Sequence, residues 1–157
     1  MANYNSDQYN NGKATGAGVG QAGSVQALIG SIEIATANVI NDTITMVTAP
    51  AGFTPLYGWL VGDDLDTGTE ALELDVGIAG DTTKYLNSGV VSGDTIANEK
   101  ITVGIKIPLQ EELMTVKPTA FTTDTDIIVT FTAAANAGGT GTLTLMLFGL
   151  YNSPQVV

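Results

Sequence analysis

From Val25 to Tyr151 the chain is a succession of short segments in which apolar and polar residues alternate, or in which a brief apolar run ends at turn residues. A period of two places apolar side chains on one face of a β-strand, whereas an amphipathic helix needs a period near 3.6. The alternation is clearest at 142–147, where Thr142 and Thr144 face one way and the intervening leucines face the other. This pattern predicts an all-β chain.

The expected strands lie at 28–36, 43–48, 56–61, 71–78, 101–107, 113–116, 127–133 and 142–151, with a weaker one at 89–96. Helical turns are expected at 81–88 and 109–112, and a Gly-rich hairpin loop at 134–141. Many short strands separated by closely spaced turns favour a two-sheet sandwich of jelly-roll or related Greek-key topology. The expected inward-facing residues are Ile32, Ile34, Ile44, Met46, Leu60, Leu72, Leu74, Val76, Ile105, Ile107, Val129, Phe131, Leu145 and Leu147.

The amino-acid composition argues against several classes of function. The 157 residues suit one domain and include 22 Thr and 19 Gly, a composition typical of strands and turns. The chain has no Arg, His or Cys, so the residues most used for anion binding, acid–base catalysis and soft-metal ligation are missing, and we expect neither an enzyme nor a cofactor. The net charge of −11 repels phosphate backbones, so no nucleic-acid partner is expected. No apolar run approaches the ~20 residues of a membrane span, and the N-terminus lacks the features of a signal peptide.

Residues 1–27 are expected to form an extended Gly/Asn-rich arm, followed by a β-sandwich domain at 28–157. The arm contains too few large apolar side chains to offset the entropy of ordering it. We therefore expect a neighbouring chain to hold it in place. The interface residues proposed for this segment are Tyr4, Tyr9, Lys13, Val19 and Val25.

Asp66-Thr67-Gly68 matches the core of the aspartic-protease signature. That chemistry needs two carboxylates that share a proton, which a single copy supplies only in a homodimer. Asp63 and Asp64 also stand where the protease motif has apolar residues. An acidic turn is the favoured interpretation.

The same loop contains four carboxylates between Asp63 and Glu70, and calcium takes six to eight oxygen ligands. Asp64, Asp66 and Glu70 are therefore weak candidate metal ligands. The spacing departs from the EF-hand, because Gly68 stands at a ligand position and Thr69 at the glycine position. A solvated loop is preferred, and no metal site is assigned.

Two further features have a simple structural explanation. The sequence 18–23 fits G-x-G-x-x-G, but it neither follows a strand nor opens a helix as a dinucleotide site requires. Trp59 is the only tryptophan, and packing in the core is the preferred explanation for it. Exposure at an interface is the alternative, since aromatic residues concentrate at protein contacts.

The segments 58–68, 72–77, 124–127 and 139–145, taken in this order, resemble virion structural proteins of tailed bacteriophages, in particular the small jelly-roll decoration or cement proteins of capsids. The resemblance covers about residues 30 to 151. It implies a homo-oligomer, a trimer, that binds the major capsid protein on the capsid surface after synthesis in the host cytoplasm. It implies no catalytic residue.

Three alternatives remain beside capsid decoration. The first is a subunit of the phage tail, neck or fibre, where similar β patterns occur. The second is a calcium- or carbohydrate-binding β-sandwich module, and only the acidic loop supports it. The third, an aspartic protease, ranks last.

Overall fold

The computed structural model describes residues 3–5, 25–35, 39–63, 65–66, 71–87, 106–109, 113, 117–135 and 140–151, with the backbone alone at 3–5 and 106–108. The described chain forms nine strands in two sheets. The strands are β1 (Asn3–Asn5), β2 (Val25–Ile34), β3 (Thr43–Ala49), β4 (Phe53–Gly62), β5 (Glu73–Ile78), β6 (Asp81–Leu86), β7 (Lys106–Pro108), β8 (Thr125–Ala133) and β9 (Gly141–Tyr151). None of the described residues belongs to a helix long and apolar enough to cross a membrane.

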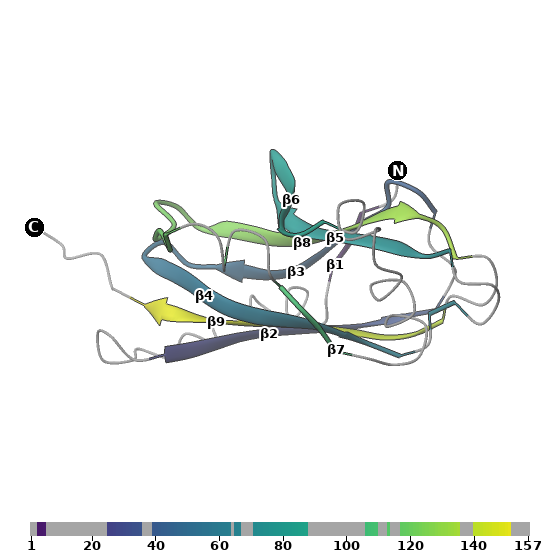
Figure 1. Ribbon diagram of the computed structural model, residues 1–157, viewed down its shortest axis with the longest axis horizontal. Helices are drawn as coiled ribbons and strands as arrows, with labels where there is room; N and C mark the ends of the chain where they lie inside the picture. The colour runs from purple at the N-terminus through teal and green to yellow at the C-terminus, as the bar shows by residue number, and fades with distance from the viewer. Residues whose placement is uncertain are drawn as a thin grey trace, which may run out of the picture.

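The strand order is that of a jelly roll. One sheet has the order β1-β3-β8-β5-β6 and the other the order β2-β9-β4-β7. Figure 1 shows these sheets as two layers, with β3, β5 and β8 in one and β2, β4 and β9 in the other. The chain changes sheet at almost every connection, and only β5 and β6 follow each other within one sheet. The predicted all-β sandwich is confirmed.

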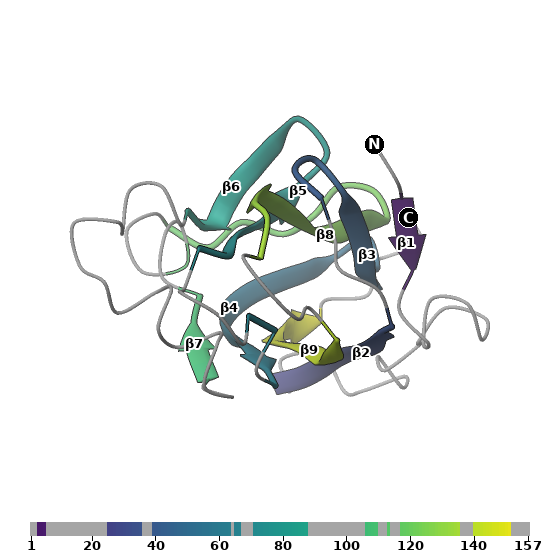
Figure 2. The ribbon, with the colours of Figure 1, turned by 90° about the vertical axis from the view of Figure 1, so that its right-hand side faces the viewer.

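β1 extends the five-stranded sheet beyond the eight strands of the jelly roll. It pairs with β3 in parallel, with Tyr4 opposite Ile44, whereas the other strand pairs are antiparallel. Figure 2 shows β1 beside β3 at the edge of this sheet, far from β6 at the opposite edge. The first residues of the predicted arm therefore contact the sandwich of their own chain.

The space between the sheets is filled by large apolar side chains. Of the predicted core residues that the structure describes with side chains, all are buried except Ile32, which is partly buried against the core. The core also contains Leu28, Phe53, Tyr85, Ile127 and Leu143, each at most 1% exposed. Ile105 and the side chain of Ile107 lie outside the described residues.

Six predicted strands are confirmed as β2, β3, β4, β5, β8 and β9, and the end of the one expected at 101–107 coincides with the start of β7. The expected strand at 89–96 and residues 101–105 lie outside the described residues.

Three local predictions are wrong. Residues 81–86 of the expected helical turn form β6, which returns alongside β5 through a turn at Gly80 (φ 86°). The 134–141 connection is not a hairpin, because β8 and β9 belong to different sheets and alternation does not reveal which strands pair. The strand expected at 113–116 is wrong at Leu113, which has helical backbone geometry, and residues 114–116 lie outside the described residues.

At Gly30 the backbone of β2 lies close against β3 of the other sheet. A Cβ atom at this position would collide with the backbone carbonyl of Met46 on β3 and meet the Val47 side chain at 2.9 Å. Backbone atoms in the middle of a paired strand cannot move aside cheaply, so only glycine fits.

We expect Gly30→Ala to lower the free energy of unfolding by about 1–3 kcal/mol through overpacking. Denaturant unfolding followed by circular dichroism measures the change. The matched control is Ala27→Val, which adds more volume on the outward side of the same strand and is expected to cost less than about 0.5 kcal/mol. Equal stability of Gly30→Ala and the parent protein would contradict the close packing of β2 on β3.

Candidate interaction surface

The outward face of the four-stranded sheet is polar at one end. The Ser31 and Thr144 hydroxyls lie 2.7 Å apart and share a hydrogen bond between β2 and β9. The Thr142 hydroxyl donates to a Glu33 carboxylate oxygen at 2.9 Å, and its backbone N–H donates to Asp63 at 2.9 Å. Threonines and carboxylates are what a solvated antiparallel face normally presents.

The other end of the same face is apolar. Cross-strand partners share one face of a sheet, and the register places Ile29, Met146 and Trp59 in one row and Ala27, Phe148 and Tyr57 in the next. Val25 and Leu150 form a third pair. We call this surface the apolar face; it consists of Val25, Ala27, Ile29, Tyr57, Trp59, Met146, Phe148 and Leu150.

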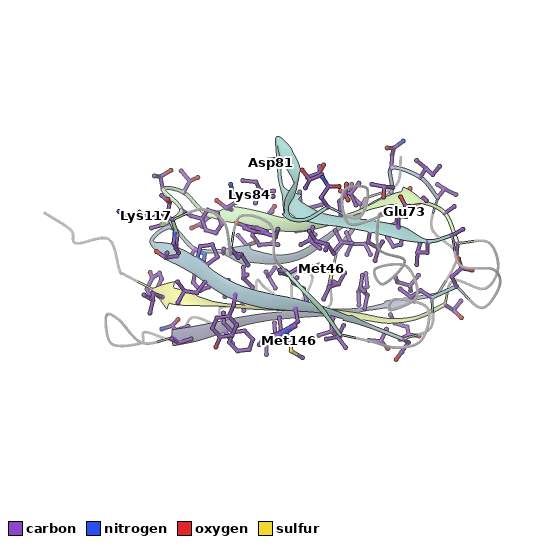
Figure 3. All side chains as sticks on the ribbon, viewed as in Figure 1. Met46, Glu73, Asp81, Lys84, Lys117 and Met146 are labelled. Atoms are coloured by element: carbon purple, nitrogen blue, oxygen red, sulfur yellow. The ribbon has the colours of Figure 1, made fainter. Side chains whose placement is uncertain are left out.

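Figure 3 shows the two sides of this sheet through two methionines, Met46 of β3 and Met146 of β9. Met46 lies between the layers and is fully buried, whereas Met146 projects from the opposite side of the four-stranded sheet. Val25, Ile29 and Tyr57 remain 54%, 41% and 43% exposed. The apolar face is therefore distinct from the core and open to contact in this chain.

Three aromatic rings form the centre of the apolar face. Tyr57 stacks on Phe148 with a centroid separation of 4.9 Å and an interplanar angle of 11°. Trp59 meets both rings edge-on, at 5.4 Å from Tyr57 and 5.6 Å from Phe148. Such pairs contribute about 0.5–1.5 kcal/mol each beyond their buried area, so the cluster is a preformed, rigid surface.

The opposite outward face differs in chemistry. On β8 the residues that alternate with the core include Asp126, Ile128, Thr130 and Thr132, and on β5 they include Glu73 and Asp75, of which Asp75 is buried. No charged residue belongs to the apolar face, although the whole chain has 16 acidic residues and 5 basic ones. One outer side of the sandwich is thus suited to apolar protein contact and the other to water or polar partners.

The acidic loop after β4 is built partly as a structural clamp. Asp66 is 2% exposed, and its carboxylate accepts hydrogen bonds from the backbone N–H groups of Ala71 at 2.9 Å and Leu72 at 3.2 Å. Asp63 is tied to β9, because it exchanges backbone and side-chain hydrogen bonds with Thr142. These contacts explain two carboxylates of the loop as anchors that hold it against the sandwich.

The other predicted site residues are tested only in part. Asp64, Glu70, Tyr9, Lys13 and Val19 lie outside the described residues, and of Tyr4 the structure gives only its place in β1. Val25 is the first residue of β2 and is exposed, at the edge of the apolar face. Among the described residues, no group of three or more acidic side chains is placed to hold a metal ion.

Two cavities lie elsewhere on the molecule. One of about 100 Å³ is lined by Lys84 and Lys117 together with Pro55 and Phe121, well below the ~300–1,000 Å³ of small-molecule pockets. The other, a depression of about 510 Å³, contains Asp124 and Asp126.

The carboxylates of this depression already have partners. Asp124 accepts from the backbone N–H of Ala51 at 3.0 Å, and Asp126 accepts from the Thr48 hydroxyl at 2.6 Å. The apolar face is therefore the stronger candidate for a functional surface.

The sequence prediction that Trp59 packs in the core is wrong, because Trp59 is half-buried and faces outward, and its place at an interface stays a prediction. The alternation of apolar and polar residues in the sequence already indicates that Trp59 faces outward. Leu60 is buried at 1% exposure, so its neighbour Trp59 must face outward, and Leu147 likewise places Phe148 outward. Extending the period of two beyond the threonines of β9 locates the whole cluster.

Comparison of the fold with solved structures identifies chains from phage capsids. A chain of the cyanophage Pam1 capsid asymmetric unit aligns with a TM-score of 0.68 and 23% identity, over 86% of this chain and 90% of that one. A chain of the Ralstonia phage GP4 capsid aligns with a TM-score of 0.68 and 22% identity, over 98% and 100%. A chain of the acidic stable capsid structure of Helicobacter pylori bacteriophage KHP30 aligns with a TM-score of 0.55 and 13% identity, over 83% and 90%.

The chain shares its fold with these capsid chains. The predicted resemblance to phage virion proteins is thereby supported at the level of the fold, because the alignments cover at least 90% of each of these capsid chains. No protein-family model and no curated protein sequence matches the chain.

We expect Asp66→Ala to lower the free energy of unfolding by about 1–3 kcal/mol, because the N–H of Leu72 is left buried without its acceptor. Thermal and denaturant unfolding with calcium and with a chelator measures the effect. The control is Glu73→Ala, which removes a nearby carboxylate outside the clamp. A melting temperature that calcium raises in the parent protein but not in Asp66→Ala would instead support a calcium site in this loop.

Proposed function

We propose that this protein is a structural component of a bacteriophage virion that decorates the capsid and bridges subunits of the major capsid protein as a homo-oligomer, a trimer. The observation that supports this most directly is the jelly-roll fold shared, over most of both chains, with chains from three phage capsid structures. The composition agrees with it, since a chain without Arg, His and Cys has few groups for chemistry and many for strands.

A decoration protein stabilises a shell by adding contacts between neighbouring shell subunits. The paired strands and dry core of this chain form a rigid body that transmits such a restraint without deforming. The net charge of −11 keeps the free protein soluble before it meets the shell. Several copies in one oligomer act together, because the first attachment raises the effective concentration of the others.

The Gly/Asn-rich arm and the loops are the proposed attachment elements. Gly- and Asn-rich sequences with few large apolar side chains bind by ordering on their partner, so part of the contact energy offsets the lost entropy. The eight jelly-roll strands β2–β9 begin at Val25, so they do not include residues 2–24, and the only described strand that a deletion of these residues removes is β1. Attachment and folding are therefore separable by truncation.

We expect deletion of residues 2–24 to abolish or weaken binding to shells of the phage that encodes the chain, while the sandwich remains folded. Co-sedimentation with undecorated shells measures binding, and far-UV circular dichroism and thermal melting verify the fold. The matched control replaces residues 6–24 with a scrambled sequence of the same composition, which distinguishes specific contacts from the presence of any tail. Normal binding by the truncated protein would show that the arm has no role in attachment.

A further inference from the structure

We infer that the apolar face is the surface through which copies of this chain associate, so that Tyr57, Trp59 and Phe148 are buried against a second copy. The inference deepens the proposed assembly, because it assigns self-association to one outer side of the sandwich. It is tested on the free protein, so its failure is distinguishable from a failure to bind capsids.

The face differs from the remainder of its own sheet. The same three strands present a hydrogen-bonded Ser–Thr pair and the Glu33–Thr142 pair at one end and eight apolar residues at the other. Ile29 and Tyr57 remain about two-fifths exposed. The isolated chain therefore lacks the stabilisation of about 25 cal/mol that burial would give for each Å² of this apolar surface. A contiguous apolar patch of this kind marks a protein contact on most soluble monomers that have one.

The charge of the chain limits the surfaces through which a second copy can associate. Two bodies with a net charge of −11 repel each other, and association requires a surface that brings no like charges together. The apolar face is such a surface, because Glu33 and Asp63 stand at the far end of the sheet. A partner that recognised the chain by charge would instead use the carboxylates of the other outer side.

The chemistry of the face also fits a permanent contact better than a contact made on a preformed shell. Interfaces between copies that never part are more apolar than those between partners that are stable separately. Stacked aromatic rings at the centre, with Ser31 and Thr144 at the margin, reproduce an apolar centre with a polar rim.

In the part of the chain that the structure describes, β2 is an edge strand of the four-stranded sheet, where a second copy can approach. Among the described residues β2 pairs with β9 alone, and its ten residues include one charged side chain and no proline. Edges of soluble sheets are usually protected by charge, proline or bulges. Val25, Ala27 and Ile29 of this edge strand belong to the apolar face, so face and edge form one continuous surface.

The test compares the parent protein with Ile29→Lys/Tyr57→Lys by sedimentation velocity and light scattering over a wide concentration range. Both side chains are exposed, so the substitutions are compatible with the folded sandwich. We expect the parent to be an oligomer and the variant to dissociate, with a dissociation constant raised at least about 30-fold. Ile29→Ser/Tyr57→Ser is a milder variant that weakens association without adding charge.

The matched control is Val39→Lys/Ile40→Lys. These residues are 59% and 54% exposed and follow the end of β2 farthest from the apolar face. The control introduces the same charge at apolar positions that are somewhat more exposed than Ile29 and Tyr57, and we expect it to leave the oligomer intact. Loss of the oligomer in the control as well would show that added charge, not the face, controls assembly.

Trp59 provides a second readout, because it is the only tryptophan and belongs to the face. Its emission should move to longer wavelength on dilution of the parent below its dissociation constant. A parent protein that is monomeric at every concentration would overturn the inference, as would an oligomer that survives both face variants.

Discussion

The fold depends on one physical constraint, the alternation of side chains between the two faces of a strand. Burying every second residue brings Leu74, Ile127, Leu145 and their neighbours into one dry layer between the sheets. Each fully buried side chain of this size contributes about 1.5–3 kcal/mol relative to exposure. The same alternation dictates what the sandwich shows to the outside, so core and surface are two results of a single pattern.

That link explains why the two outer sides differ. Once the leucines of β9 face inward, the intervening residues must face outward whatever their chemistry, and along this strand they change from Thr142 and Thr144 to Met146 and Phe148. On β8 the corresponding residues include Asp126 and Thr130. An apolar outward stripe adds nothing to the core, and the inferred association of two copies gives it a role.

Much of the fold could be predicted from periodicity because six strands and most core residues follow it directly. Pairing could not, because strands that read alike belong to different sheets, as β8 and β9 do. β6 was missed because Thr82, Thr83 and Lys84 lack the apolar alternation of a core strand. The clamp of Asp66 depends on the backbone of Ala71 and Leu72, which no residue pattern reveals. The aromatic cluster was predictable in principle, but Trp59 was assigned to the core although the buried position belongs to its neighbour Leu60.

The most direct test of the central claim is the copy number of this protein in purified virions of the phage that encodes it, measured by quantitative mass spectrometry against the major capsid protein. Capsid decoration predicts a fixed ratio that makes the protein an abundant component, as the symmetry of a shell requires. A neck, tail or fibre subunit would be present in far fewer copies. A low ratio would contradict decoration of the shell, and absence from the particle would contradict any structural role in the virion.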